Sequence, residues 1–388
     1  MRDVVIIGVG MTPFGRFMDQ SPSDLAVVAC WNAIKDANVS GKDIQTAWVG
    51  NCLAGIVTGQ QGIRGQVFLR EAGFSELPIT NVENACATAG TALRGVWMEI
   101  ALGLYDVGLA LGVEKMYVGD RAKQLKALAG LTPSELRNSG FQFTADLALH
   151  LKKYMRKYGA TREDFAKVVV KNSYNGSLNP YGQYRKPRTV EEVLSSRMIA
   201  DPLTLLMCAS IGDGAAAAVV CAKEVARKYT DKPLVHIGSV ALKSGAVRQP
   251  GADEVDDIRR RTAEEAYNRS GIGPEDIDVA ELHDAIAPNE LRIYEALGFC
   301  KEGEGAKMLN EGRTAMTGDI PVNTSGGLIA RGHPIGATGL AQVAEIVWQL
   351  RGEAGDRQVD SPKVGLCQDA GGWLGEDNAA CDIIILKK

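Results

Sequence analysis

The sequence lacks the features of a membrane protein or a small disulfide-bonded domain. Its longest uncharged stretch, residues 44–63, contains four glycines and three glutamines, which makes it too polar to span a bilayer. The chain enters an apolar run at Val4–Ile7 without a basic leader, so we expect no secretory or transit signal. The eight cysteines form no Cys-x-x-Cys pair and no zinc-type spacing. We therefore expect reduced thiols, no resident metal and a cytoplasmic location.

Histidine is scarce and glycine is abundant. The chain has four histidines (His150, His236, His283 and His333), whereas its 44 glycines make up about 11% of 388 residues, against a usual ~7%. The glycine pair at Gly8–Gly10 lacks the remaining residues of a dinucleotide fingerprint, and no Walker A motif occurs. NAD and nucleoside-triphosphate sites of those types are therefore excluded.

Positive charge is concentrated in one segment. Residues 121–190 hold 14 Lys/Arg and 4 Asp/Glu, a net of +10, so the rest of the chain carries −14 of the total −4. One interpretation is a solvated helical surface; the other is an electrostatic field that attracts a polyanionic ligand. No nucleic-acid-binding motif accompanies the charge, which favours a phosphorylated small molecule over nucleic acid.

Short apolar runs alternate with helical patterns along the chain, which is typical of an α/β protein. Many of the runs are apolar throughout, which indicates sheets covered on both faces. Helices are predicted over Asp146–Tyr158, Arg162–Ser173 and Ala89–Leu102. The predicted strands are Val4–Ile7, Ala47–Val49, Ile79–Val82, Val107–Leu111, Ala216–Cys221, Val235–Ile237, Val279–Leu282, Val364–Cys367 and Cys381–Leu386.

The two ends of the chain resemble each other at nearly one offset. The segments 37–44 and 270–277, 7–9 and 237–239, and the positions of Val82 and Val322 correspond in the same order. Shared strand–turn–helix patterns would also produce short matches, but the preserved order favours duplication. We therefore divide the chain into residues 1–228, with an insert at 119–199, and residues 229–388.

Cys86 is the best candidate for a nucleophile. It lies at a predicted strand-to-helix turn among small residues, where the positive end of the following helix is expected to lower its pKa. The alternative for Cys86 is a buried, inert thiol. We interpret the other cysteines, apart from Cys367, as thiols of that kind.

Two histidines have surroundings that suggest chemistry. His333 lies in a segment with five glycines in fourteen residues, 326–339, where it could deprotonate a thiol or bind an oxyanion. His283 follows a predicted strand, at the end where α/β folds bind ligands; the alternative is that Asp284 caps the next helix and His283 is exposed. His150 and His236 are interpreted as structural. A second glycine-rich segment, 365–375, either forms a tight hairpin or presents backbone N–H groups to an oxyanion.

Together these segments resemble the thiolase superfamily, and the resemblance runs from Val4 to Leu386. Conventional thiolases have Asn-Glu where this chain has His283-Asp284, which is similar to the sterol-carrier-protein type of bacterial and archaeal thiolase. The other segments that carry the resemblance are the Cys86 turn, Ile211–Ala217, Gly332–Gly339, Tyr158–Glu163, Asn179–Tyr181 and Ala200–Leu203.

The resemblance implies a fold and a ligand. The fold would be the α/β thiolase fold, in which two duplicated βαβαβαββ halves form five αβαβα layers. Residues 119–199 would be an inserted loop domain that binds coenzyme A, so that CoA and acyl-CoA are substrates and no cofactor is permanently bound. Ser239 would correspond to a serine that contacts the pantetheine arm. The assembly would be a homodimer or a dimer of dimers.

The implied reaction is thiolysis of a 3-oxoacyl-CoA, or the reverse Claisen condensation. His333 would take the proton of Cys86, whose thiolate attacks the 3-keto carbon and keeps the acyl group when the Cα–Cβ bond breaks. His283 and His333 would stabilise the enolate oxygen of the departing acyl-CoA. The N–H groups of Cys86 and of Gly371 or Gly372 would hold the other oxyanion.

One position departs from this branch of the family. A second cysteine usually follows the histidine by two residues and serves as the acid/base for the enolate carbon, but this chain has Ala285 there. Cys367 is the candidate replacement, although its spacing from the glycines fits poorly. The smaller side chain also predicts a larger pocket, suited to a bulky or aromatic acyl group.

Some members of this branch work with a small partner that combines a zinc ribbon and an OB fold, among them benzoylsuccinyl-CoA thiolase of anaerobic aromatic degradation. Two other functions remain open at this point. One is a condensing enzyme similar to ketoacyl synthases, and the other is a non-catalytic acyl-CoA-binding subunit.

Overall fold

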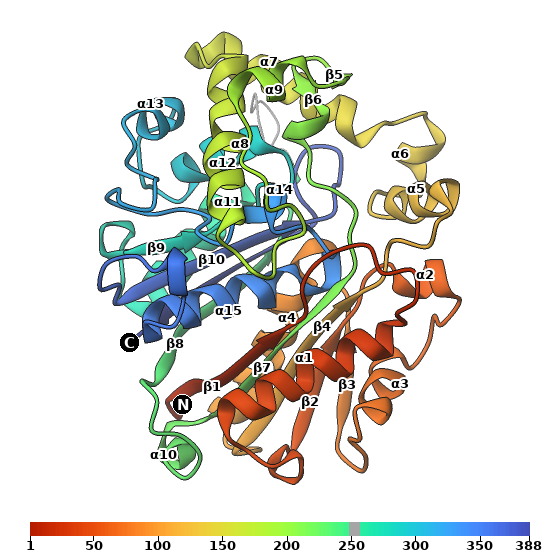
Figure 1. Ribbon diagram of the computed structural model, residues 1–388, viewed down its shortest axis with the longest axis vertical. Coiled ribbons are helices and arrows are strands. Elements are labelled where there is room, and N and C mark those ends of the chain that lie inside the picture. Colours follow the sequence, from red (N-terminus) through yellow and green to blue (C-terminus); the bar gives the residue numbers. More distant parts are fainter. Residues whose placement is uncertain (248–256) are drawn as a thin grey trace.

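The computed structural model describes residues 1–247 and 257–388 (Figure 1). A mixed nine-stranded sheet runs through these residues in the order β3-β2-β4-β7-β1-β8-β11-β10-β9. Every strand predicted from the sequence is present, and several extend further through glycine and polar residues that interrupt the apolar pattern. The strands are β1 (Val4–Met11), β2 (Thr46–Gly50), β3 (Ile79–Val82), β4 (Val107–Glu114), β7 (Gly214–Ala222), β8 (Val235–Ser244), β9 (Val279–Glu281), β10 (Val364–Gly371) and β11 (Ala380–Lys387).

The sheet consists of two parts with the same topology. In the N-terminal part β7 is antiparallel to both neighbours, β4 and β1, and β2 is parallel to β3 and β4. In the C-terminal part β11 is likewise antiparallel to β10 and β8, and β9 is parallel to β10. A parallel bridge from Ala280 to Val322 takes the place of β3, as the predicted match of Val82 with Val322 requires. The two parts meet where β1 pairs with β8.

Helices cover the sheet in layers, as predicted. The helices α4 (Thr88–Ala101) and α15 (Thr338–Arg351) pack on each other between the two parts of the sheet. In Figure 1, α15 lies between β10 above and β1 below. The helix α1 (Pro22–Ala37) packs on β1 and β7, and α11 (Ile258–Ser270) packs on β8 and β11, on the two outer faces. Nearly every residue of α15 is buried, as expected for a helix enclosed on all sides.

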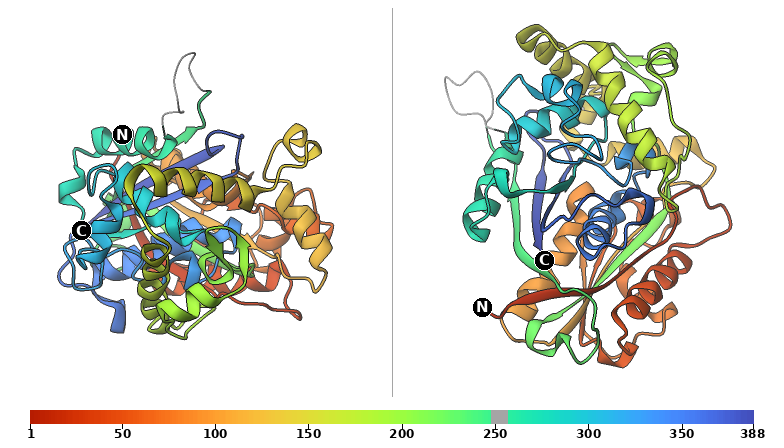
Figure 2. Two further views of the ribbon diagram at one scale, coloured as in Figure 1. Left: turned by 90° about the horizontal axis from the view of Figure 1, so that it is seen from above. Right: turned by 60° about the vertical axis from the view of Figure 1, so that its left-hand side comes forward.

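The insert lies at one end of the molecule, against the C-terminal part (Figures 1 and 2). It contains α5 (Arg121–Ala129), α6 (Ser134–Asn138), α7 (Phe143–Tyr158), α8 (Arg162–Ser177) and α9 (Val190–Ser195), and a small sheet of β5 (Met198–Ala200) and β6 (Leu203–Thr204) begins at its C-terminal end. The helix α8 packs against α12 (Ala287–Ala296), α13 (Gly305–Asn310) and α14 (Gly327–Ala330). None of the described helices is long and apolar enough to cross a membrane.

Short helices complete the described chain. They are α2 (Ala54–Thr58), α3 (Arg64–Glu71), α10 (Lys223–Ala226), and the 3₁₀ turns η1 (Gly41–Asp43), η2 (Ala85–Ala87), η3 (Leu205–Met207), η4 (Pro274–Asp276), η5 (Ile335–Ala337) and η6 (Gly355–Arg357). The turns η1 and η4 follow α1 and α11 at equivalent places in the two parts, where the sequence match 37–44 with 270–277 predicts them.

Candidate active site

Cys86 lies in η2, between the end of β3 and the start of α4, and is nearly buried. The turn is strained, because Ala85 adopts a φ of 49°, a left-handed conformation that side chains other than glycine rarely take. The end of β10 packs directly against it. A Cβ atom at Gly371 would overlap the backbone nitrogen of Cys86 and the carbonyl oxygen of Asn84, so only glycine fits at this position.

His333 faces the thiol. Its Nε2 lies 3.2 Å from the Cys86 Sγ, and its Nδ1 lies 2.7 Å from the Thr338 hydroxyl. That hydroxyl donates its one hydrogen to the carbonyl oxygen of Pro334, at 3.0 Å, and so it accepts from Nδ1–H of His333. The proton of the neutral imidazole is therefore on Nδ1, which leaves the Nε2 lone pair directed at the thiol.

His283 completes the cluster. Its ring packs edge-on against that of His333, with centroids 5.1 Å apart, and its Nδ1 contacts Asp369 Oδ1 of β10. The Cys86 sulfur and one ring nitrogen from each histidine lie within 4.8 Å of one another. The structure thus brings together Cys86, His283 and His333 from separate loops, as the sequence predicts.

Burial determines the charge state of the cluster. It raises the pKa of the Cys86 thiol well above the usual range, and Asp369, Glu114 and Glu83 raise it further. This contradicts the expected lowering by the helix end, because desolvation and neighbouring carboxyls outweigh the helix dipole. Burial also lowers the pKa of His333 and, to about 3, the pKa of His283, with Arg331 adding to both shifts. At neutral pH the resting pair is therefore a thiol and a neutral imidazole rather than an ion pair.

A cavity of about 1140 Å³ opens from this cluster. Ala285, at the position of the missing cysteine, lies in its wall. Apolar and aromatic side chains from the insert and from the β10–β11 loop form another part: Leu125, Leu128, Leu131, Phe141, Phe143, Leu147 and Trp373. Basic side chains are contributed by Arg137, Lys153, Lys157, Arg259, Arg260 and Arg292.

Two predicted site residues lie outside this cavity. Ser239, in β8, is 2% exposed and pairs with Ile385 of β11, so its side chain is enclosed in the sheet core. Cys367, in β10, is completely buried and packs in the layer of α4 and α15, because it lies on the strand face opposite to Gln368, which lines the cavity. Neither side chain is placed to touch a substrate there, which corrects the roles expected for them.

The other predicted residues are distributed as follows. Gly371 lies against Cys86, and Gly372, with a φ of 66°, lines the cavity. His150 also lines the cavity and packs edge-on against Trp373, although it was interpreted as purely structural. His236 lies in β8, as predicted.

Asp284 is a structural anchor. It accepts hydrogen bonds from Leu328 N–H, at 2.6 Å, and from the Asn172 amide, at 2.8 Å, and so connects the loop after β9 with α14 and α8. Burial, together with Glu290, raises its pKa to about 7. The sequence context suggested a helix cap for Asp284; in the structure it instead joins three elements.

Sequence reasoning missed three residues that organise the site: Glu114, Thr338 and Asp369. Glu114, at the end of β4, accepts hydrogen bonds from the backbone N–H groups of Cys52, Leu53, Ala54 and, at 3.0 Å, of Gly336 in the His333 loop. The only signal for it was a charged residue ending an apolar strand. Thr338 and Asp369 lie within the two glycine-rich segments, 326–339 and 365–375, whose interpretation rested on their glycines and on His333.

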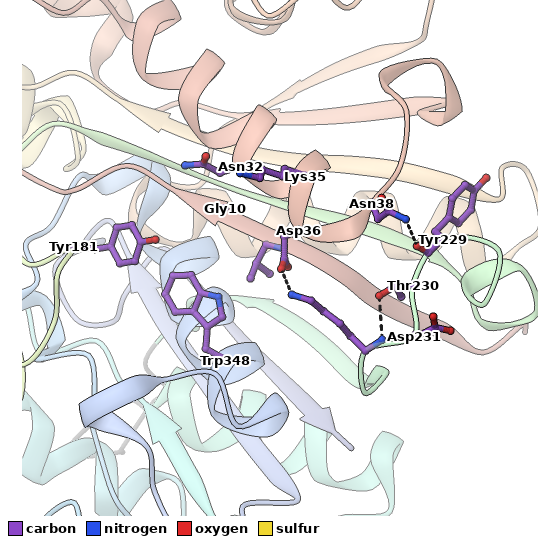
Figure 3. Close-up of a pocket in the computed structure, with 12 residues that line it drawn as sticks. Gly10, Asn32, Lys35, Asp36, Asn38, Tyr181, Tyr229, Thr230, Asp231 and Trp348 are labelled. Atoms are coloured by element: carbon purple, nitrogen blue, oxygen red, sulfur yellow. Dashed lines mark hydrogen bonds and ion pairs between the residues drawn. The ribbon is translucent and has the colours of Figure 1, made fainter.

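A second cavity, of about 580 Å³, lies on the far side of the fold between α1, α15 and the segment before β8 (Figure 3). No cysteine or histidine is among the described residues that line it. Asp36 and Lys232 pair across it at 2.5 Å, and the rings of Tyr181 and Trp348 stack 5.2 Å apart. Its charges largely satisfy each other, since Lys232 pairs with both Asp36 and Glu353.

Comparison with known families decides what the Cys86 cluster belongs to. The family described as "Thiolase, N-terminal domain" matches residues 4–224, and "Thiolase C-terminal domain-like" matches residues 252–385. The chain belongs to the thiolase family. It is therefore an acyl-CoA C-acyltransferase with the thiolase fold, which confirms the fold class, enzyme class and family predicted from the sequence.

Full-length thiolase relatives support the same conclusion. An acetyl-CoA acetyltransferase of Methanothermobacter thermautotrophicus is 43% identical, covering 97% of this chain and 98% of its own. Benzoylsuccinyl-CoA thiolase subunit BbsB of Thauera aromatica is 38% identical, covering 96% and 95%. Sterol carrier protein 2 of Bos taurus is 38% identical over 95% of this chain and 70% of its own, which confirms the predicted branch.

Solved structures also support the thiolase fold. The structure described as "Ltp2-ChsH2(DUF35) aldolase" has a TM-score of 0.83 at 27% identity, covering 99% of this chain and 97% of that one. Human mitochondrial 3-ketoacyl-CoA thiolase in complex with CoA has a TM-score of 0.76 at 18% identity, covering 100% and 98%. At that identity the second likeness concerns the fold alone.

Proposed function

We propose that Cys86 is the acyl-carrying nucleophile of this thiolase and that His333 is its base. The observation that carries the proposal is the 3.2 Å contact between His333 Nε2 and the Cys86 thiol, with Thr338 holding the proton on Nδ1. His333 takes the thiol proton, and the thiolate attacks the 3-keto carbon of a 3-oxoacyl-CoA. The Cα–Cβ bond then breaks, which leaves the acyl group on sulfur and an enolate of acyl-CoA.

The two oxyanions of the reaction are held by different groups. His283 and His333 face the enolate oxygen from adjacent loops. The N–H of Cys86 and that of Gly372, which lines the cavity beside Gly371, stabilise the oxyanion on the attacked carbon. Free CoA then takes the acyl group from Cys86 by thiolysis, and the reverse sequence of steps is a Claisen condensation.

CoA is the second substrate in this proposal, and it occupies the large cavity under the insert. The apolar wall suits a pantetheine arm and an acyl chain. The basic side chains from α6, α7, α11 and α12 supply counter-charges for phosphates, and three of them, Arg137, Lys153 and Lys157, come from the basic segment 121–190. We assign residues 1–228 and 229–388 to the two thiolase halves, with 119–199 as the CoA-binding loop domain.

A bulky or aromatic acyl group is the proposed substrate. Ala285 lies in the cavity wall where a larger residue would narrow it, and aromatic side chains line the opposite wall. The relative BbsB is named as a benzoylsuccinyl-CoA thiolase subunit, and the match covers 95% of its length. We propose a role in aromatic degradation on this basis.

A small partner protein and a homodimer, or a dimer of dimers, are the proposed assembly. BbsB is named as a subunit, and the Ltp2 structure is named together with ChsH2(DUF35), which supports a partner subunit; we propose that it is the zinc-ribbon and OB-fold protein expected from the sequence. Among the described strands, the edge strand β3 pairs only with β2, and we propose that its other side faces a second copy. The eight free cysteines support a reducing, cytoplasmic compartment.

The test is thiolysis of a series of 3-oxoacyl-CoAs, followed by loss of the enolate absorbance, with and without any co-purifying partner. We expect turnover by the wild type and a loss of at least about 10⁴-fold in Cys86→Ser, with the acyl group trapped on Cys86 of the wild type when CoA is withheld. Binding of acyl-CoA without turnover by any preparation would instead identify a non-catalytic subunit. Turnover of acyl-carrier-protein thioesters alone would identify a condensing enzyme.

A further inference from the structure

Two buried carboxyl groups lie directly behind His283. Asp369 on β10 and Asp382 on β11 are opposite each other in the antiparallel pair, so both side chains point to the same face with Cβ atoms about 5 Å apart. Asp369 is 0% exposed and Asp382 is 1% exposed. Asp369 Oδ1 contacts His283, whereas Asp369 Oδ2 and both oxygens of Asp382 accept no hydrogen bond from any described group.

Glycines in the first turns of α4 and α15 leave space for these two carboxyl groups. A Cβ atom at Gly90, in the first turn of α4, would overlap the Asp382 carboxyl group. A Cβ atom at Gly339, in the first turn of α15, would lie 3.3 Å from Asp369 Oδ2 and 3.0 Å from the backbone nitrogen of Gly90. The two carboxyl groups therefore sit where the bare backbones of both central helices meet, enclosed and without solvent.

Two adjacent carboxyl groups in such a place cannot both be ionised. Burial raises the pKa of each well above its usual range, and the charge of Asp369 raises that of Asp382 further. The positive charge of Arg331, at the end of α14, opposes the rise in the pKa of Asp369. Arg331 is itself paired with Glu281 at 3.0 Å. The pair therefore holds at least one proton at neutral pH, in contact with Nδ1 of His283.

We propose that Asp369 and Asp382 store a transferable proton that passes through His283 to and from the α-carbon of the acyl-CoA. The relay replaces the second cysteine, whose place Ala285 occupies. The inference rests on the proposed function and names the missing acid/base within it. His283 is the catalytic residue of the relay, and the two aspartates are positioning residues that act through it.

The proton balance closes over one turnover. When the Cα–Cβ bond breaks, Nε2–H of His283 protonates the enolate carbon, and the carboxyl proton of Asp369 moves to Nδ1, which leaves a carboxylate that shares the proton of Asp382. His333 meanwhile keeps the proton of Cys86. In the second half, the thiol proton of CoA returns to Nε2 of His283, Nδ1 returns its proton to Asp369, and His333 reprotonates Cys86 as the acyl group leaves it.

Cys367 is the competing candidate, and it serves as the matched control. It lies two residues before Asp369 on the same face of β10, but it packs among apolar side chains and does not line the cavity. Substituting it changes the same strand and the same layer without touching the relay.

The experiment measures exchange of the methyl hydrogens of acetyl-CoA with D₂O by NMR, together with the rate at which iodoacetamide alkylates Cys86. In Asp369→Asn the amide keeps a hydrogen bond to His283 but has no acidic proton, so exchange should fall about 100-fold or more while alkylation stays within about threefold. In Asp382→Asn, which leaves the His283 contact in place, exchange should fall about 10-fold. Cys367→Ala should match the wild type in both measurements.

The outcomes separate the alternatives. Wild-type exchange in Asp369→Asn, or loss of exchange in Cys367→Ala, would overturn the relay. If Asp369→Asn does not fold, the Asp382→Asn result decides, and unchanged exchange there overturns the proposal as well. A wild-type enzyme that neither exchanges acetyl-CoA nor cleaves any 3-oxoacyl-CoA would contradict the proposed function itself.

Discussion

At the scale of single residues, the Cys86 site depends on which nitrogen of His333 carries a proton. The Thr338 hydroxyl settles this because its own hydrogen is committed to the Pro334 carbonyl. The neutral thiol and neutral imidazole that burial produces at rest mean that the thiolate forms only when substrate is present to accept it. Oxidation of a standing thiolate is thereby limited.

Thr338→Val removes the acceptor for Nδ1–H while preserving the shape of the side chain. The imidazole can then place its proton on Nε2, facing the thiol, where it is unable to act as a base. We expect kcat for thiolysis to fall about 10- to 100-fold, as for other residues that orient a catalytic histidine. Thr338→Ser retains the hydroxyl and should stay near the wild type. Equal activity in all three proteins would show that Thr338 does not fix the tautomer.

Ala285→Leu tests whether the space next to His283 accommodates a large acyl group. The added side chain would extend into the cavity wall and compete with a bulky substrate for volume. We expect kcat/KM for an aromatic 3-oxoacyl-CoA to fall at least about 10-fold relative to acetoacetyl-CoA, measured side by side. A parallel loss on both substrates would indicate damage to His283 instead of a change in specificity.

At the scale of elements, the site is assembled where loops from both parts of the sheet converge. Cys86 comes from the turn after β3, His333 from the loop before α15, and His283 from the loop after β9. Buried carboxyls tie these loops together: Glu114 at the end of β4 binds the His333 loop, and Asp284 binds α14 and α8. Each carboxyl satisfies backbone N–H groups that would otherwise be buried without partners.

Glu114 should make the stability of the enzyme depend on pH. Burial raises its pKa to about 7, although hydrogen bonds from Leu53, Gly336, Ala54 and Cys52 oppose the shift; its ordinary value is 4.5. Between these values the folded state holds a proton that the unfolded chain has released, so the free energy of unfolding falls as the pH rises through this window. Across the whole window, this titration lowers the free energy of unfolding by about 3 kcal/mol.

Glu114→Gln removes this titration. Between pH 4.5 and pH 7.5 the free energy of unfolding of the variant should rise by up to about 3 kcal/mol relative to that of the wild type, measured by urea unfolding at both pH values. The exposed α9 residue Glu191 provides the control, since Glu191→Gln should follow the wild-type slope. An identical slope for Glu114→Gln and the wild type would contradict the raised pKa of Glu114.

At the scale of the whole molecule, the two parts share a continuous core. The helices α4 and α15 bury their side chains in one cluster with β1, β7, β8, β10 and β11, which belongs to both parts, and a further cluster lies on the outer side of each part. Arg351 at the end of α15 is fully buried and pairs with Asp36 of α1 at 2.8 Å. The same carboxylate accepts from Val9 N–H and pairs with Lys232, which places charges from both parts around one group (Figure 3).

Asp36→Asn should destabilise the whole molecule at once. It leaves the buried guanidinium of Arg351 without its nearest counter-charge, which we expect to lower the free energy of unfolding by about 3 kcal/mol. Because the core is shared, calorimetry should still show one transition, shifted to lower temperature. The neighbouring exposed residue supplies the control, Asp231→Asn, with little change expected. Two separate transitions in Asp36→Asn would indicate that the parts unfold independently.

The sequence by itself determined the fold family and singled out the three side chains, Cys86, His283 and His333, that the structure brings together. Local geometry determines the apolar runs of the strands and the positions of glycine. Cys86, His283 and His333 each lie in a motif whose backbone requirements can be recognised from the sequence alone. Only the tertiary structure decided their environment. Whether Cys86 is acidic, whether Ser239 and Cys367 reach the substrate, and where Asp369 meets Asp382 all depend on burial and on which strand face a side chain occupies. Those properties arise from contacts between segments hundreds of residues apart, and no local pattern encodes them.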